Sequence, residues 1–285
     1  MTAPGLLARS EIQAATSVDD AVARLAELGT EGAPLAGGTW LMRSARPPRT
    51  FISLQRVAEL REVSVNGWGA LVTHAELAAA ALPPALHAVR TAARTSAFPQ
   101  VRNVATLGGN LSARGFAEAD LVPALLALDA TVEVATPAGR QRTDVEAYLR
   151  VAQSSGPALL VSATAPAPMG RFSGYGRLTV RGGGEYAIAS VAIAADLDGA
   201  RVASTVRVAV GSVEARARRC PEAEALLTGT VLDETSARAA GRAAAEVLTA
   251  RDDLLAPGWY RLEVLPVVFA RAAADCLAAT PEETS

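Results

Sequence analysis

The chain has 285 residues, of which 50% are hydrophobic, and its 27 basic residues against 29 acidic ones give a formal net charge of −2 at pH 7. A near-neutral chain lacks the basic surface that attracts nucleic acid or an anionic membrane, so we expect neither as a partner. No apolar run approaches the roughly 20 residues that span a bilayer, and residues 1–10 lack the pattern of a secretory signal. The length allows about two domains with a proper core.

The few cysteines and histidines argue against metal and hydrolytic chemistry. Cys220 and Cys276 lie far apart and belong to no C-x-x-C motif, so this chain is not expected to hold zinc or an iron–sulfur cluster by itself. Thiols in that arrangement favour a reduced, cytoplasmic protein. His74 and His87 have no acids clustered with them, and no Ser/His/Asp grouping is present. We therefore predict no metal ligands and no catalytic residues in this chain.

Residues 1–55 predict a small βαβ unit. A helix is expected to start at Ser17, where Asp20 completes a capping-box-like pair, and to end at Gly29. Strands are expected at 33–38 and 51–54. The first of these strands ends in adjacent glycines, Gly37 and Gly38, which let a backbone approach a ligand where a Cβ would clash.

Residues 56–176 predict a larger mixed α/β block. Strands are expected at 60–65 and 70–73 around an Asn66-Gly67 turn, and Thr73 with Glu76 predicts a helix from His74. Later in the block we expect helices at 85–95 and 121–128, and strands at 130–136, 159–163 and 172–180. Between the two helices lies a second pair of glycines, Gly108 and Gly109, with Asp120 shortly after them.

Residues 177–285 predict a C-terminal domain with an antiparallel sheet and helices. Two long apolar runs, 187–197 and 201–210, flank Asp198-Gly199, which is a hairpin signal. Helices are expected at 221–227, 234–250 and 259–277, the last kinked at Pro266.

The two glycine pairs together carry more information than either alone. A single Gly-Gly turn requires only a backbone with positive φ, and neither pair forms a G-x-G-x-x-G or P-loop motif. Two such segments in one chain suggest a single ligand held from two sides, with backbone amides that approach phosphate oxygens.

The amino-acid sequences of the two segments resemble those of the FAD-binding subunit of the molybdenum hydroxylases. In that family of xanthine and carbon monoxide dehydrogenases, an A-G-G-T-[DE]-L segment and a Q-[IV]-R-N-x-[AG]-T-[IL]-G-G-N segment hold FAD. Leu35 to Leu41 and Gln100 to Leu111 match these segments, and the resemblance extends over nearly the whole chain. It implies an α+β fold with a two-part FAD-binding domain of the PCMH type, similar to vanillyl-alcohol oxidase, at 1–55 and 56–176. An antiparallel C-terminal domain would follow at 177–285.

The resemblance also implies which residues bind the cofactor. The two segments would hold the pyrophosphate, Asp120 would accept hydrogen bonds from ribose or ribitol hydroxyls, Leu160 would pack on the cofactor, and Arg177 would lie near the pyrimidine edge of the flavin. Each of these residues also has an ordinary structural explanation. Asp120 could be an acid at a helix N-terminus, Leu160 a buried core leucine and Arg177 a surface arginine. The full set is Leu35, Ala36, Gly37, Gly38, Thr39, Trp40, Leu41, Thr106, Leu107, Gly108, Gly109, Asn110, Asp120, Leu160 and Arg177.

Three positions depart from the family pattern. Trp40 replaces the acid of the first segment, Phe98 replaces a polar residue, and Arg114-Gly115-Phe116 replaces Ala-Ser-Pro. An indole cannot accept the hydrogen bonds that a carboxylate accepts, so the contact at Trp40 is expected to be lost or replaced by stacking.

The function implied is that of an FAD-binding electron-transfer subunit in a heteromeric molybdopterin-dependent dehydrogenase. Its partners would be a small subunit with two [2Fe–2S] clusters and a large molybdopterin subunit, and a small-molecule acceptor would take the electrons. Two alternatives stay open: a stand-alone FAD-dependent oxidoreductase on the same fold, and a non-enzymatic subunit whose flavin site has decayed.

Overall fold

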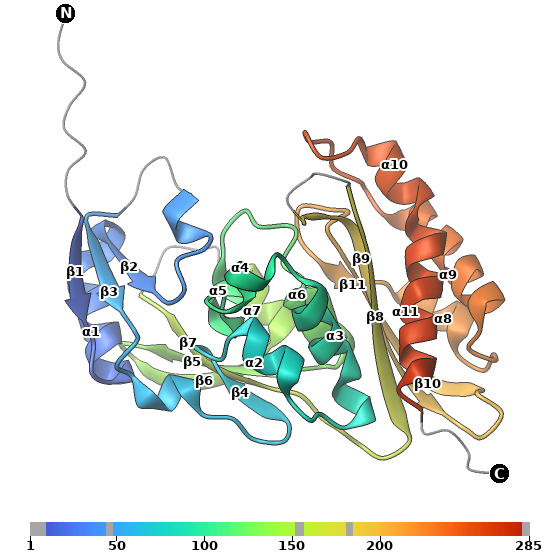
Figure 1. Ribbon diagram of the computed structural model, residues 1–285, viewed down its shortest axis with the longest axis horizontal. Coiled ribbons are helices and arrows are strands. Elements are labelled where there is room, and N and C mark those ends of the chain that lie inside the picture. Colours follow the sequence, from blue (N-terminus) through green and yellow to red (C-terminus); the bar gives the residue numbers. More distant parts are fainter. Residues whose placement is uncertain (1–9, 44–47, 152–156, 181–184, 281–285) are drawn as a thin grey trace, which may run out of the picture.

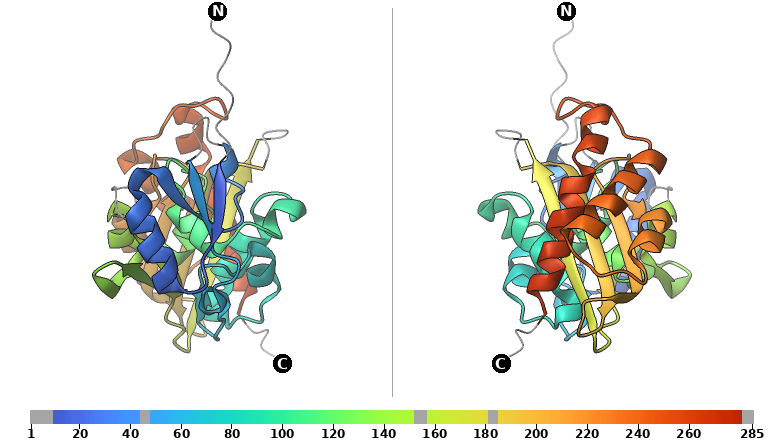
Figure 2. Two further views of the ribbon diagram at one scale, coloured as in Figure 1. Left: turned by 90° about the vertical axis from the view of Figure 1, so that its left-hand side faces the viewer. Right: turned by 90° about the vertical axis from the view of Figure 1, so that its right-hand side faces the viewer.

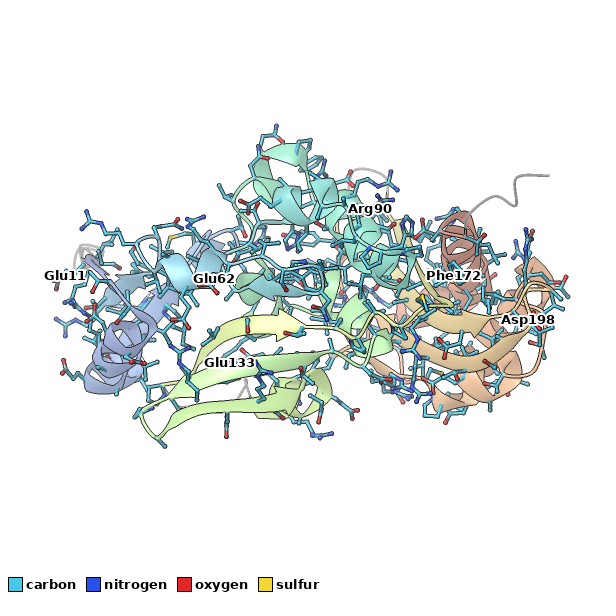
Figure 3. The ribbon with its side chains drawn as sticks, turned by 90° about the horizontal axis from the view of Figure 1, so that it is seen from below. Glu11, Glu62, Arg90, Glu133, Phe172 and Asp198 are labelled. Carbon is cyan, nitrogen blue, oxygen red and sulfur yellow. The ribbon has the colours of Figure 1, made fainter. Side chains whose placement is uncertain are left out.

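The computed structural model describes residues 10–43, 48–151, 157–180 and 185–280 of the chain. Three sheets, formed by consecutive parts of the sequence, follow one another along the longest axis of the molecule (Figure 1). Seen from below, Glu11 of the first sheet and Asp198 beside the third lie at opposite ends, with Glu133 of the second sheet between them (Figure 3). In the described part of the chain, no helix has the length and apolar character needed to cross a bilayer.

The N-terminal unit is a parallel sheet with one helix. Its strands are β1 (Glu11–Ala14), β2 (Gly32–Leu35) and β3 (Thr50–Ser53), in the order β1-β3-β2, and α1 (Val18–Leu28) packs against them (Figure 2, left). The Ser17 side chain accepts a hydrogen bond from the Asp20 amide, and Gly29 ends the helix with a φ of 55°. The predicted βαβ unit is confirmed. Strand β1 was not predicted, because it has only four residues, none of them buried, and such a short alternation of polar and apolar residues is a weak strand signal.

The middle unit is an antiparallel sheet with six helices against and around it. Its strands lie in the order β4-β7-β5-β6. Their bounds are β4 (Gly67–Gly69), β5 (Thr131–Thr136), β6 (Gly139–Asp144) and β7 (Leu159–Thr164). The helices of this unit are α2 (His74–Ala79), α3 (His87–Thr95), α4 (Pro99–Arg102), α5 (Leu107–Ser112), α6 (Leu121–Ala127) and α7 (Val145–Val151).

The strands predicted at 60–65 and 70–73 have the wrong bounds. Residues Ala58–Arg61 form a 3-10 turn, and the Leu71 amide donates to the Leu60 carbonyl at 2.7 Å. A Cβ built on Gly69 would lie 2.3 Å from the Leu60 carbonyl oxygen, so the backbone folds tightly on itself here. The chain does turn back on itself at the predicted Asn66-Gly67 turn, where Val63 and Trp68 form an isolated antiparallel bridge. Only the bounds of the strands were wrong, because the one strand formed here is β4, at Gly67–Gly69.

The C-terminal unit is a four-stranded antiparallel sheet covered on both faces. Its strands are β8 (Arg171–Thr179), β9 (Ala187–Leu197), β10 (Ala203–Gly211) and β11 (Arg218–Arg219), in the order β11-β10-β9-β8. Helices α3 and α6 cover one face, and three of the C-terminal helices cover the other (Figure 2, right). The C-terminal helices are α8 (Pro221–Leu227), α9 (Glu234–Val247), α10 (Gly258–Glu263) and α11 (Leu265–Ala278). The kink predicted at Pro266 is a break at Val264, between α10 and α11.

Because β8 begins at residue 171, a domain boundary before it, rather than after 176, would keep this sheet whole.

Helix α11 lies directly on the backbone of β8. A Cβ on Gly174 would lie 2.1 Å from the Cys276 amide nitrogen and 2.3 Å from the Ala272 carbonyl oxygen, and Gly176 meets the Val268 carbonyl in the same way. These two glycines therefore permit a helix-to-strand approach that no other residue allows.

We predict that Gly174→Val lowers the free energy of unfolding by about 3 kcal/mol or more, because the overpacked helix must move. Urea unfolding measures this loss. Gly199→Val is the matched control, since a Cβ at Gly199 meets nothing within 4 Å. Equal stability of the two variants would contradict the close approach of α11 to β8.

Candidate functional site

The two glycine segments lie directly against each other. A Cβ built on Gly37 would lie 1.7 Å from the carbonyl oxygen of Val104, which precedes the glycine pair within the second segment. Gly38 adopts a φ of +70°, and the Met42 amide donates to its carbonyl at 3.0 Å. Within the described residues, the amides of residues 37–40 donate to no protein acceptor. The first segment is therefore a tight loop, seated on the second segment, with a run of unused donors.

The second segment is the start of helix α5 rather than a turn. The Thr106 hydroxyl caps the helix by accepting from the Gly109 amide at 3.1 Å. The amides of Leu107 and Gly108 donate to the carbonyls of Val72 and Ala70 at 2.9 and 2.8 Å. The Asn110 amide donates within the helix. All amides from 107 to 110 are thus already used inside the protein, so this segment provides a wall beside the first loop rather than a set of free donors.

The two glycines of α5 have different surroundings. A Cβ on Gly108 would lie 2.7 Å from the Cβ of Ala70, whereas a Cβ on Gly109 would meet only the Thr106 hydroxyl, at 3.1 Å. Gly108 is buried and Gly109 is exposed. Gly108 serves packing, and Gly109 leaves space open in front of the helix.

The first loop contacts the chain on both sides of α5. Gly37 contacts Val104 before the helix, and the Trp40 indole donates to the Arg114 carbonyl, after the helix, at 3.0 Å.

Asp120 and Arg177 form a separate buried cluster with Tyr175. The Tyr175 hydroxyl donates to Asp120 Oδ1 at 2.6 Å, and Arg177 Nε lies 3.4 Å from the same oxygen. Asp120 is only 6% exposed, and its burial raises the pKa of the carboxyl group even though Arg177 lowers it. Burial also raises the pKa of Tyr175 well above its ordinary value, so the phenol remains the hydrogen-bond donor.

This cluster joins the middle and C-terminal units. Asp120 precedes α6, and Tyr175 and Arg177 lie on β8. The guanidinium of Arg177 also donates to the carbonyls of Thr95 and Glu185. One Asp120 oxygen is thus committed within the protein, and the ribose or ribitol contact of this residue stays a prediction. Leu160, on β7, is 3% exposed within the core, and its contact with a cofactor likewise stays a prediction.

Four side chains from all three units meet at the end of the first loop. The Trp40 ring stacks on Phe116 with centroids 4.3 Å apart, and Phe116 meets the edge of Tyr186 at 6.2 Å. The Arg43 guanidinium lies over Trp40 at 5.6 Å and over Tyr186 at 5.5 Å, and it donates to the Tyr186 hydroxyl at 2.7 Å. We call Trp40, Arg43, Phe116 and Tyr186 the Trp40 cluster. Phe98 is 49% exposed at the start of α4 and is not part of it.

His74 is hydrogen-bonded to the backbone of the second segment. Its amide donates to the Ala105 carbonyl at 2.9 Å, and its ring is 3% exposed with Nδ1 2.6 Å from the Ser96 hydroxyl. Because that hydroxyl donates to the Ala93 carbonyl, Nδ1 must carry the proton, which leaves Nε2 as a buried acceptor without a partner in the described residues. Burial, with Arg102 nearby, lowers the pKa of His74 to about 4. The imidazole is therefore neutral at physiological pH.

The sequence identified the two segments but not all of their neighbours. Arg43, Tyr186 and Tyr175 were missed, because their partners are far away in sequence and no motif marks them. The joint departure at Trp40 and Phe116 was a signal that those two residues meet. Among the described residues, no group of three or more His, Cys, Asp or Glu side chains is placed to hold a metal ion.

Two family models match the chain in succession. Residues 8–165 match the FAD binding domain in molybdopterin dehydrogenase, and residues 176–276 match the CO dehydrogenase flavoprotein C-terminal domain.

Similar proteins with known roles match over most of their length. The nicotine 6-hydroxylase medium subunit of Paenarthrobacter nicotinovorans is 32% identical over 240 residues, which cover 80% of this chain and 83% of that subunit. The carbon monoxide dehydrogenase medium chain of Afipia carboxidovorans is 28% identical over 269 residues, 90% of this chain and 92% of the relative. Among solved structures, reconstituted CO dehydrogenase from Oligotropha carboxidovorans superposes with a TM-score of 0.86 at 26% identity and covers 98% of this chain and 100% of that one.

We predict that acid destabilises the protein through His74. The unfolded ring binds a proton near pH 6.5 and the folded ring only near pH 4, so stability is lost as the pH falls between these values, by about 3 kcal/mol. His74→Asn, whose Nδ2 can still donate to Ser96, should remove most of this loss. Urea unfolding at pH 7 and pH 4.5 tests the pair, and an unchanged pH dependence in the variant would contradict the assignment.

Proposed function

The chain belongs to the family of FAD-binding medium subunits of molybdopterin dehydrogenases, and from this premise we propose that it is the electron-transfer subunit of a heteromeric complex. It is an FAD-binding oxidoreductase subunit with the fold of CO dehydrogenase medium chains. When bound, FAD supplies two-electron chemistry and can pass electrons on to an external acceptor, and the protein supplies binding, orientation and electrostatics.

The position of the first loop, packed against the second segment, supports the proposed binding site of FAD. Unused amides at residues 37–40 are suited to phosphate oxygens, which need several donors and no cation. The contact between Gly37 and Val104 holds those amides beside α5, where exposed Gly109 leaves room for a ligand. The residues present therefore fit a pyrophosphate.

The other proposed contacts follow from position. Leu35, Ala36 and Leu41 flank the donor loop, and Thr106, Leu107 and Asn110 build the wall of α5. The Asn110 side chain accepts from the Leu121 amide at 3.1 Å and so fixes the start of α6 next to Asp120. Asp120 and Arg177 would hold the sugar and the flavin end. Their buried pairing keeps a negative and a positive group at fixed positions at the junction of two units.

The relatives support partner subunits. They are medium chains or a subunit of dehydrogenase complexes, which implies small and large partners in general. We propose a small [2Fe–2S] subunit, a large molybdopterin subunit and a small-molecule electron acceptor. The relatives are named for nicotine, carbon monoxide and glyceraldehyde, so this subunit does not by itself fix the substrate. Cys220 and Cys276 are buried free thiols, and on this ground we propose a cytoplasmic location.

We predict that the purified chain binds FAD and prefers it to FMN. FMN lacks the pyrophosphate for which the donors at residues 37–40 are suited. Quenching of flavin fluorescence in parallel titrations measures both affinities. Equal affinities would contradict the assignment of the loop, and absence of binding would favour a decayed site.

We predict that Gly109→Val weakens FAD binding about tenfold or more, a change of 1.4 kcal/mol, while the melting temperature stays near that of the wild type. The branched side chain would enter the open space in front of α5. Gly108→Val should lower both, because its side chain would overlap Ala70. Gly199→Val is the control for both variants. Unchanged binding in Gly109→Val would show that the ligand does not use this space.

A further inference from the structure

The Trp40 cluster attaches one end of the first loop to the chain that follows α5. At the other end, Gly37 lies on the Val104 carbonyl, so the loop is attached at both of its ends. A ligand segment held by the amides of residues 37–40 would lie between these two attachments. It can leave quickly only if one attachment opens.

The two attachments differ in kind. The Gly37 contact is backbone against backbone. The Trp40 attachment consists of side chains at the surface: a stacked ring pair, one indole hydrogen bond and an exposed arginine. Contacts of partly exposed side chains open with a smaller free-energy change than buried ones, so the Trp40 end is the one that can open locally.

The rings of the cluster are in contact with each other and leave no slot between them. Centroids 4.3 Å apart are at the short end of the distances at which aromatic pairs stack, so a third ring cannot lie between Trp40 and Phe116. The cluster is therefore not a binding site for a flat ring in this arrangement. Its role lies in the connections that it makes.

Those connections run across all three units of the chain. Trp40 lies in the first loop and Arg43 follows it, Phe116 follows α5, and Tyr186 precedes β9. Arg43 contacts both Trp40 and Tyr186, so it links the N-terminal unit to the C-terminal unit. Opening of this end would release the first loop from both of the other units together.

We propose that the Trp40 cluster is a clasp that closes the first loop over bound FAD and sets the rate at which the cofactor leaves. This inference rests on the proposed function, because it names FAD as the enclosed ligand. The clasp lowers the dissociation rate of FAD through the contact of Trp40 with Phe116, and not through a contact of either ring with FAD alone.

The test is the dissociation rate of FAD from the full-length chain. Protein loaded with FAD is diluted, and the recovery of free FAD fluorescence gives the rate. The variants are Trp40→Leu, Phe116→Leu, their double variant, and Arg43→Met. Trp259→Leu is the matched control, since Trp259 is 66% exposed on α10 and contacts Tyr260 instead.

We expect Trp40→Leu and Phe116→Leu each to speed dissociation about tenfold, as the loss of 1.4 kcal/mol would do. The double variant should be no faster than the faster single variant, because both changes remove the same contact. Arg43→Met should speed dissociation by a smaller factor, and Trp259→Leu should match the wild type. Arg43 is exposed, so its variant carries the test even if a change at Trp40 impairs folding.

Wild-type rates in the three single variants would overturn the clasp while leaving FAD binding intact. Independent, multiplying effects of Trp40→Leu and Phe116→Leu would overturn it as well, since each ring would then act on the cofactor separately. Failure of the wild-type chain to bind FAD at any concentration would instead overturn the proposed function, and the clasp with it.

Discussion

The contact of the Gly37 backbone with the Val104 carbonyl is the constraint on which the candidate site depends. It can form only where no Cβ is present, and it brings a loop of the N-terminal unit onto the helix start of the middle unit. With the loop held there, four consecutive amides have no acceptor among the residues that the structure describes, and Gly109 of the second segment is exposed. The two glycine pairs, 71 positions apart from Gly37 to Gly108, thus contribute in different ways to a single space. One presents donors, and the other presents a wall that allows close approach.

Two of the departures from the family pattern, at Trp40 and Phe116, are explained by a single contact between them. The structure places the rings of these two residues in contact. An acid at position 40 could not stack, and a proline at 116 would offer no aromatic face. The contact between the two rings therefore requires both departures. Arg43 and Tyr186 extend that contact to the C-terminal unit, while Asp120, Tyr175 and Arg177 join the same units through buried polar groups.

Local signals predicted much of the fold. Ser17 and the Thr73–Glu76 box mark helix starts that the structure contains, and Asp198-Gly199 marks the turn between β9 and β10. The strands predicted at 60–65 and 70–73 have wrong bounds, because Ala58–Arg61 form a 3-10 turn and β4 covers only Gly67–Gly69, although the backbone pairs across the predicted turn. In the site, the sequence named both segments but could not show that the amides of Leu107 and Gly108 are used by Val72 and Ala70. Such pairing depends on tertiary contacts, as do the partners of Trp40.

The most direct test of this view is an experimental structure of the chain loaded with FAD. We expect the pyrophosphate oxygens to accept hydrogen bonds from the amides of residues 37–40, with Gly109 alongside and Trp40 still in contact with Phe116. A pyrophosphate bound elsewhere, with those amides facing solvent, would contradict the role assigned to the Gly37 contact.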